Sequence, residues 1–131
     1  MNWIYKKICL PLMLIDNNVY TFLSGILISL STNIFTTLCF EKLEIVTQWH
    51  LYLSVLLYLI SGALCIYLAT KMTGYQNYIY SKQIISVKEK KSIIKDVTGD
   101  DKAMWCISFL ICIVTLILGT VFLFINYLFL K

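Results

Sequence analysis

Three long stretches without a charged residue constrain what this chain can fold into. They cover residues 17–40, 45–70 and 103–130. Each is longer than the roughly 18 apolar residues that indicate a membrane span. As a helix, residues 17–40 would extend about 36 Å, against about 30 Å for the hydrocarbon core of a bilayer. The sequence therefore predicts three transmembrane helices, at residues 17–40, 47–70 and 103–130.

Composition excludes the alternative of three buried helices in a soluble core. Apolar residues make up 60% of the 131 residues and charged residues only 14%, which leaves no polar face for water. We predict an all-α membrane protein with one integral membrane domain over residues 1–131, its three transmembrane helices forming a left-handed bundle. No small-residue cleavage site follows the apolar run at residues 8–15, so we expect no cleaved signal peptide.

Small and polar residues recur along one side of each predicted span. Lipid is as apolar as leucine, so small residues and hydroxyl groups mark where transmembrane helices meet. In the second span the pattern comprises Ser54, Tyr58, Ser61 and Cys65. The first and third spans supply the predicted helix-packing or oligomer face, which comprises Gly25, Ser29, Thr32, Asn33, Thr36, Thr37, Ser108, Cys112, Thr115 and Gly119.

Asn33 adds a polar group that the packing pattern of the first span does not require. An amide without a partner is costly in hydrocarbon, so a partner is expected. Three partners fit: another helix of the same chain, a second copy of the chain, or water in a pore. The sequence alone leaves all three open.

Two segments flank the spans on one side. Residues 1–16 hold an apolar run too short to cross the membrane, and we expect an interfacial segment there. The second span is expected to run to about Thr70, with Thr73–Gly74 as the signal that ends its helix, and a basic loop covers residues 71–102. This loop is predicted as a helix that continues the second span, with a hairpin around residues 88–91 as the alternative. Its predicted partner-docking residues are Tyr78, Tyr80, Lys82, Lys88, Lys90, Lys91 and Lys95.

Lysine placement predicts the orientation in the membrane. Two lysines precede the first span and seven lie in residues 71–102, whereas residues 41–48 and the C-terminus hold one each. The positive-inside rule then places the N-terminus and the basic loop in the cytoplasm, and the C-terminus outside. We expect a multi-pass protein of a bacterial inner membrane that contacts lipid.

The sequence contains few residues in patterns that support catalysis. Its one histidine, His50, has no second histidine or acid at ligand spacing, and the five cysteines form no metal-binding pattern. The chain has no arginine and no glycine-rich phosphate loop. We expect a non-enzyme with no cofactor, no metal site and no direct nucleic-acid binding.

In outline, three small charge-free spans and a basic cytoplasmic segment resemble the membrane subunits of bacterial anti-phage defence systems of the Kiwa type. That resemblance implies a homo-oligomer and a soluble cytoplasmic protein partner, docked on residues 75–102. The size and the Lys-, Ile- and Asn-rich composition also resemble immunity proteins of pore-forming colicins. A holin-like, pore-forming permeabiliser is the third alternative, although holins usually end in a charged cytoplasmic tail.

Overall fold

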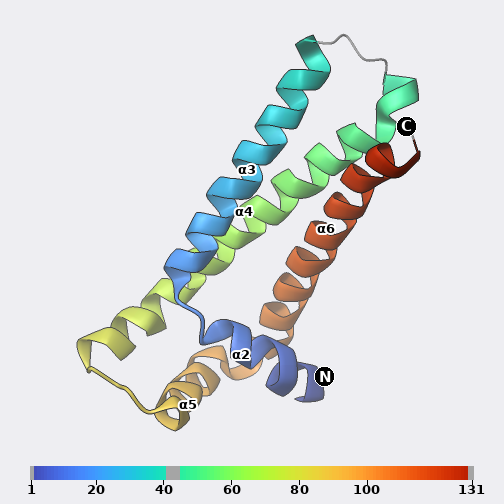
Figure 1. Cartoon of the computed structure of the whole chain (residues 1–131). Coiled ribbons are helices and arrows are strands. Elements are labelled where there is room, and N and C mark those ends of the chain that lie inside the picture. The colour runs from blue at the N-terminus through green and yellow to red at the C-terminus, as the bar shows by residue number, and fades with distance from the viewer. Residues whose placement is uncertain (1, 41–44, 130–131) are drawn as a thin grey trace.

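Three long helices form the body of the protein in a computed structural model that describes residues 2–40 and 45–129. They are α3 (Asn17–Phe40), α4 (Ile45–Ser81) and α6 (Lys102–Phe129), arranged as an elongated bundle (Figure 1). Each is long and apolar enough to cross a membrane, and no strand occurs among the described residues. The predicted all-α, three-helix class is confirmed.

Helix α4 is the central element because it packs against both α3 and α6. Its interface with α3 is close at Gly62, where an added Cβ would lie 3.0 Å from Ile28 Cγ1. Its interface with α6 is close at Gly119, where an added Cβ would lie 3.3 Å from atoms of Leu57 and Tyr58. Glycine at these two positions lets the backbones approach.

The expected helix end at Thr73–Gly74 is wrong. Helix α4 continues to Ser81, and residues beyond Gly74 become part of the core. Tyr75, Gln76 and Ile79 are buried, whereas Gly74 lies on the exposed side and meets nothing in the protein. Burial of one side of this extension outweighs the weak helix-breaking tendency of a single glycine.

The basic segment is helical, as predicted, and the hairpin alternative is wrong, but residues 82–86 separate its helix from α4, so it does not continue the second span. Helix α5 (Val87–Thr98) begins just before the Lys-Glu-Lys-Lys sequence that a hairpin would have used as its turn. A 3-10 turn, η2 (Gly99–Asp101), joins α5 to α6. Gly99 has a φ of 38°, a left-handed conformation that glycine adopts at little cost.

The N-terminal segment is also helical and closes one end of the bundle. It comprises α1 (Asn2–Ile4), a π-helical turn η1 (Tyr5–Cys9) and α2 (Leu10–Met13). Tyr5, Cys9 and Met13 recur every fourth residue and are buried, so one side of the segment belongs to the core. Figure 1 shows this segment beside α5, at the end opposite to the end of α6.

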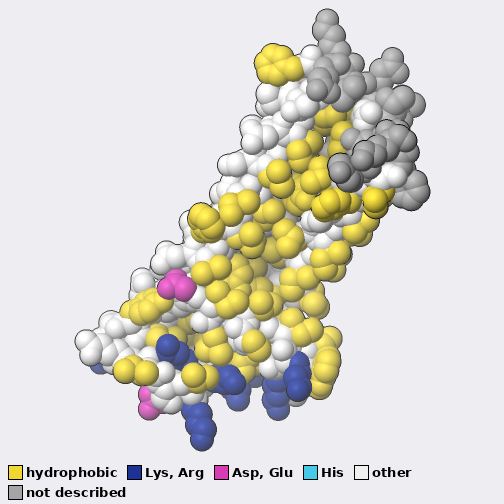
Figure 2. All heavy atoms as spheres, in the orientation of Figure 1, with side chains coloured by type: hydrophobic (Ala, Val, Ile, Leu, Met, Phe, Trp, Pro, Cys, Tyr) yellow, Lys and Arg dark blue, Asp and Glu magenta, His cyan; other side chains and the backbone are white. Residues whose placement is uncertain are grey.

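We call this the lysine-rich end. It comprises the N-terminal segment, residues 71–81 of α4, α5, η2 and the first turn of α6. Figure 2 shows lysines gathered there, while apolar side chains cover most of the visible length of the three helices. This distribution of apolar and charged surface is the one expected of a membrane-spanning bundle with one basic end.

Candidate functional site

The polar face of α3 points away from the rest of the protein. This face comprises Gly25, Ser29, Thr32, Asn33, Thr36 and Thr37, all of them exposed. The opposite side of the helix, including Ser24, Leu27, Ser31 and Leu38, is buried. The prediction that these six residues form a packing face within one copy of the chain is therefore wrong. As an oligomer face it stays a prediction.

Two polar side chains on this face lack a partner among the described residues. The hydroxyls of Thr32, Thr36 and Thr37 donate to carbonyl oxygens one turn earlier, at 2.7–3.0 Å. The Ser29 hydroxyl and the Asn33 amide make no such bond. Asn33 lies seven residues before the end of α3, about 10 Å inside it along the axis.

A surface groove follows the same two side chains. It has a volume of about 520 Å³ and is lined by Phe22, Gly25, Ile26, Ser29, Leu30 and Asn33. Gly25 lines the groove at a point with open space, because an added Cβ there would meet nothing within 4 Å. The groove thus combines apolar walls with an amide and a hydroxyl that are free to bond with another helix.

The interface between α4 and α6 contains the polar residues expected of the second and third spans. The Ser54 hydroxyl donates to the Gly119 carbonyl at 2.8 Å, and the Ser61 hydroxyl to the Cys112 carbonyl at 3.2 Å. The Tyr58 hydroxyl lies 3.1 Å from Thr120 Oγ1. These bonds fix α6 on α4 without the help of α3.

The four predicted residues of the third span divide into two pairs. Cys112 and Gly119 are buried against α4. Ser108 and Thr115 are half-buried, and their hydroxyls donate to carbonyl oxygens of their own helix. The interior between the helices is closed by packed side chains, including an edge-to-face contact of Tyr20 and Phe109 at 5.9 Å. A water-filled path through one copy of the chain is therefore not supported.

The predicted docking residues lie at the end of α4, in the turn that follows it and on α5. Tyr78 and Tyr80 lie at the end of α4 and are about half exposed, at 51% and 55%. Lys82 lies in the turn after α4 and is exposed. The other four lysines lie on α5; they are Lys88, Lys90, Lys91 and Lys95, with Lys90 and Lys91 half-buried. Ile94 and Thr98 are the buried residues of α5, so the helix is amphipathic and firmly seated.

A network of hydrogen bonds ties the N-terminal segment to α4, which the sequence did not predict. Gln76 Oε1 accepts from the Asn17 backbone N–H at 2.7 Å, and Gln76 Nε2 donates to the Ile15 carbonyl at 2.7 Å. The Tyr75 hydroxyl donates to the Met13 carbonyl at 2.8 Å. The four-residue spacing of Tyr5, Cys9 and Met13 was the available signal for a buried side.

Two further contacts of this segment have electrostatic consequences. Asp16 caps α3, accepting from the Asn18 backbone N–H at 2.8 Å and from the Tyr80 hydroxyl. These bonds, with Tyr80 the larger cause, hold the pKa of Asp16 below its ordinary value. Burial raises the pKa of the Cys9 thiol to about 12, so Cys9 stays protonated and acts as a packing residue.

In the parts of the chain that the structure describes, we find no cluster of side chains suited to catalysis. No three metal-ligating side chains come together among residues 2–40 and 45–129. His50 is 5% exposed, and its Nε2 atom has no hydrogen-bond partner among those residues. Cys9, Cys65, Cys106 and Cys112 are buried and Cys39 is exposed.

No protein family model matches the chain, and neither the curated proteins nor the solved structures contain a significant match.

Proposed function

We propose that the protein is a non-enzymatic subunit of a bacterial inner-membrane complex that acts in anti-phage defence. In this proposal, copies of the chain assemble through the polar face of α3. The lysine-rich end lies in the cytoplasm and binds a soluble protein partner. The observation that carries the proposal is the exposed, unpartnered Asn33 amide inside an apolar span.

The energetic reason for assembly is the position of that amide. Within a bilayer no water is present to bond the Asn33 side chain, so the lone protomer carries an unsatisfied polar group. A second copy that presents the same face supplies an amide to donate and accept in return. Small residues at Gly25 and Ser29 let the two backbones approach, as in other closely packed transmembrane pairs.

The lysine-rich end supports the docking part of the proposal. Under the positive-inside rule its lysines face the cytoplasm. Helix α5 is anchored by Ile94 and Thr98 and exposes Lys88 and Lys95, and Tyr78 is exposed at the end of α4. A rigid basic surface with exposed aromatic side chains suits an acidic partner surface.

The colicin-immunity and holin-like alternatives make different demands on the same surfaces. An immunity protein would use the polar face of α3 to bind helices of a toxin, and it would act as a monomer. A permeabiliser would need a water-lined path between copies, because the interior of one copy is packed. The oligomeric mass and the effect on cells therefore separate the three.

Assembly is tested by the molecular mass of the protein in mild detergent, measured by light scattering after gel filtration. We expect an oligomer for the wild-type chain, and Asn33→Leu and Gly25→Leu should shift it to monomer. Gly74→Leu is the matched control, since a Cβ added at Gly25 or at Gly74 meets nothing within 4 Å. A wild-type monomer would sink the proposal, and protection of cells against a pore-forming colicin would then favour the immunity alternative.

Docking is tested by co-purification from cells that express the chain with its neighbouring genes. Changing Lys88, Lys90 and Lys91 together to Glu should abolish recovery of the soluble partner, while the same three changes to Arg should preserve it. Membrane insertion is measured in parallel with a reporter fused to the C-terminus. Equal recovery of the partner with the Glu and Arg variants would contradict docking on α5.

A further inference from the structure

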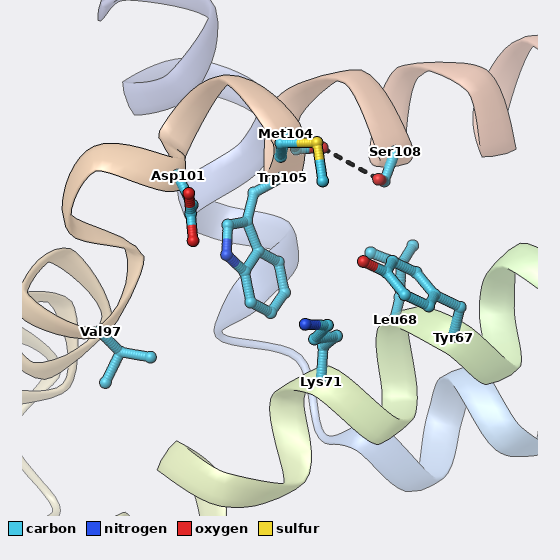
Figure 3. Close-up of a pocket in the computed structure, with 8 residues that line it drawn as sticks. All are labelled: Tyr67, Leu68, Lys71, Val97, Asp101, Met104, Trp105 and Ser108. Carbon is cyan, nitrogen blue, oxygen red and sulfur yellow. Dashed lines mark hydrogen bonds between the residues drawn. The ribbon is translucent and has the colours of Figure 1, made fainter.

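A second candidate site lies between α4 and α6, well away from the polar face of α3. It is a cavity of about 220 Å³ (Figure 3). Helix α4, the end of α5, η2 and α6 all contribute to its walls. The lining residues are Tyr67, Leu68, Lys71, Val97, Asp101, Met104, Trp105 and Ser108.

The cavity holds one positive and one negative side chain that do not neutralise each other. Within the described residues, neither Lys71 nor Asp101 forms an ion pair; Lys71 Nζ instead lies 5.8 Å from the centre of the Tyr67 ring. Figure 3 shows the Trp105 indole between the Lys71 amino group and the Asp101 carboxylate. Trp105 is held in place by a tilted ring contact with Tyr75, at 6.4 Å between centroids. Both charges therefore remain available to a ligand.

The cavity lies where the apolar spans meet the charged end. Lys71 directly follows the charge-free residues 45–70, and Asp101 lies two residues before the charge-free residues 103–130. Lipid headgroups occupy this level in a bilayer, and tryptophan is enriched there. Farther along the spans, exposed Ile60 on α4 and Ile111 on α6 offer apolar surface for acyl chains.

We propose that this cavity binds the headgroup of a phospholipid that carries both a phosphate and a primary ammonium, that is, phosphatidylethanolamine. Lys71 would donate to the phosphate. Asp101 would accept hydrogen bonds from the ammonium, and the face of Trp105 adds cation–π attraction. Asp101 repels a phosphate that has no accompanying ammonium, so the site selects against phosphatidylglycerol.

This inference goes beyond the proposed function because it requires neither a second copy of the chain nor a soluble partner. It is tested by native mass spectrometry of the full-length protein in detergent, titrated with dioleoyl phosphatidylethanolamine, dioleoyl phosphatidylglycerol, or both. The wild-type chain should retain one phosphatidylethanolamine at least about tenfold more strongly than phosphatidylglycerol. Equal retention of the two lipids would overturn the proposal.

Variants of the two charged residues sharpen the test. Asp101→Asn should remove the preference and raise retention of phosphatidylglycerol, whereas Lys71→Gln should weaken retention of both lipids. Lys82→Gln and Asp96→Asn are matched controls, because both residues are exposed and lie outside the cavity. Helix content by circular dichroism shows that each variant is folded. A preference that survives Asp101→Asn would refute the role of the carboxylate.

A final arm separates a lipid from a soluble ligand of the same chemistry. Excess O-phosphoethanolamine, which has the headgroup without acyl chains, should leave the bound lipid in place, because it lacks the apolar contacts along Ile60 and Ile111. Displacement of the lipid by this soluble compound would show that the cavity serves a soluble ligand and would overturn the lipid assignment.

Discussion

Gln76 is the residue on which the attachment of the N-terminal segment depends most. Its side chain is 5% exposed, and it bonds with two residues that flank Asp16, accepting from the Asn17 N–H and donating to the Ile15 carbonyl. Both distances are 2.7 Å. The Asn17 N–H belongs to the first turn of α3 and has no partner within its own helix. Gln76 thus satisfies one orphan donor and one orphan acceptor together.

Gln76→Leu keeps a side chain of similar size but removes both bonds. A buried hydrogen bond contributes about 1 kcal/mol, so the change should destabilise the closed position of the segment by about 2 kcal/mol. At about 1.4 kcal/mol per factor of ten, local opening of residues 2–18 should become roughly thirtyfold more frequent. The bonds of Tyr75 and Tyr5 remain, so the bundle itself should stay folded.

Hydrogen–deuterium exchange with peptide-level mass spectrometry measures this opening directly. Amides of residues 2–18 should exchange faster in Gln76→Leu, while those of the α4–α6 interface should keep their wild-type rates. Asn77→Leu, at the exposed neighbouring position, is the matched control and should leave exchange unchanged. Exchange of residues 2–18 at the wild-type rate in Gln76→Leu would refute the reasoning.

Three further predictions concern other contacts. Ser54→Ala should lower stability by about 1 kcal/mol, seen as a lower thermal midpoint in detergent, because a buried bond to an α6 carbonyl is lost; Ser81→Ala, at an exposed position, should have no effect. Because the pKa of Asp16 is lowered in the folded protein, its carboxylate stabilises the fold above about pH 4 and this contribution is lost as the pH falls further. The thermal midpoint should therefore drop more between pH 6 and pH 3 in the wild-type chain than in Asp16→Asn. The sulfur atoms of Cys65 and Cys112 are 3.4 Å apart, so mild oxidation should cross-link peptides of α4 and α6 within one chain, detected by mass spectrometry.

The three long helices were predictable because their signal is simple. Charge-free stretches longer than a bilayer is thick have few alternatives to a spanning helix. The serines of α4 were equally informative, since Ser54 and Ser61 sit on the same side as Cys65, and that side meets α6. Local composition and spacing were sufficient for these features.

The packing side of α3 was not predictable by the same rule. Its interface within the chain is formed by large side chains such as Leu27 and Leu38, with Ser24 and Ser31 beside them. The face with more small and polar residues lies opposite. Contacts within a chain and contacts between chains use the same residue types in a membrane, so a helical pattern shows that a face has a partner but does not show which one.

The closed N-terminal segment was missed for a different reason. Its apolar run is interrupted by Pro11 and is too short to span, which favoured an interfacial position. In the structure Pro11 follows the π-helical turn η1 inside a continuous helical run, and such a turn locally changes the hydrogen-bond pattern of a helix. The segment packs against α6 and α5 and is hydrogen-bonded to α4. The partners of Tyr75 and Gln76 lie about sixty residues away, beyond the reach of a local pattern.

Disulfide cross-linking between copies in native membranes tests the assembly through α3 most directly. Ser29 lies at the centre of the polar face, and Phe35, about 9 Å farther along the helix, is exposed on another side. Ser29→Cys and Phe35→Cys are compared in a Cys39→Ser background, because Cys39 is itself exposed. We predict that oxidation cross-links two copies through Ser29→Cys and leaves Phe35→Cys as single chains. No cross-link at residue 29, or equal cross-linking at both positions, would contradict assembly through the polar face of α3.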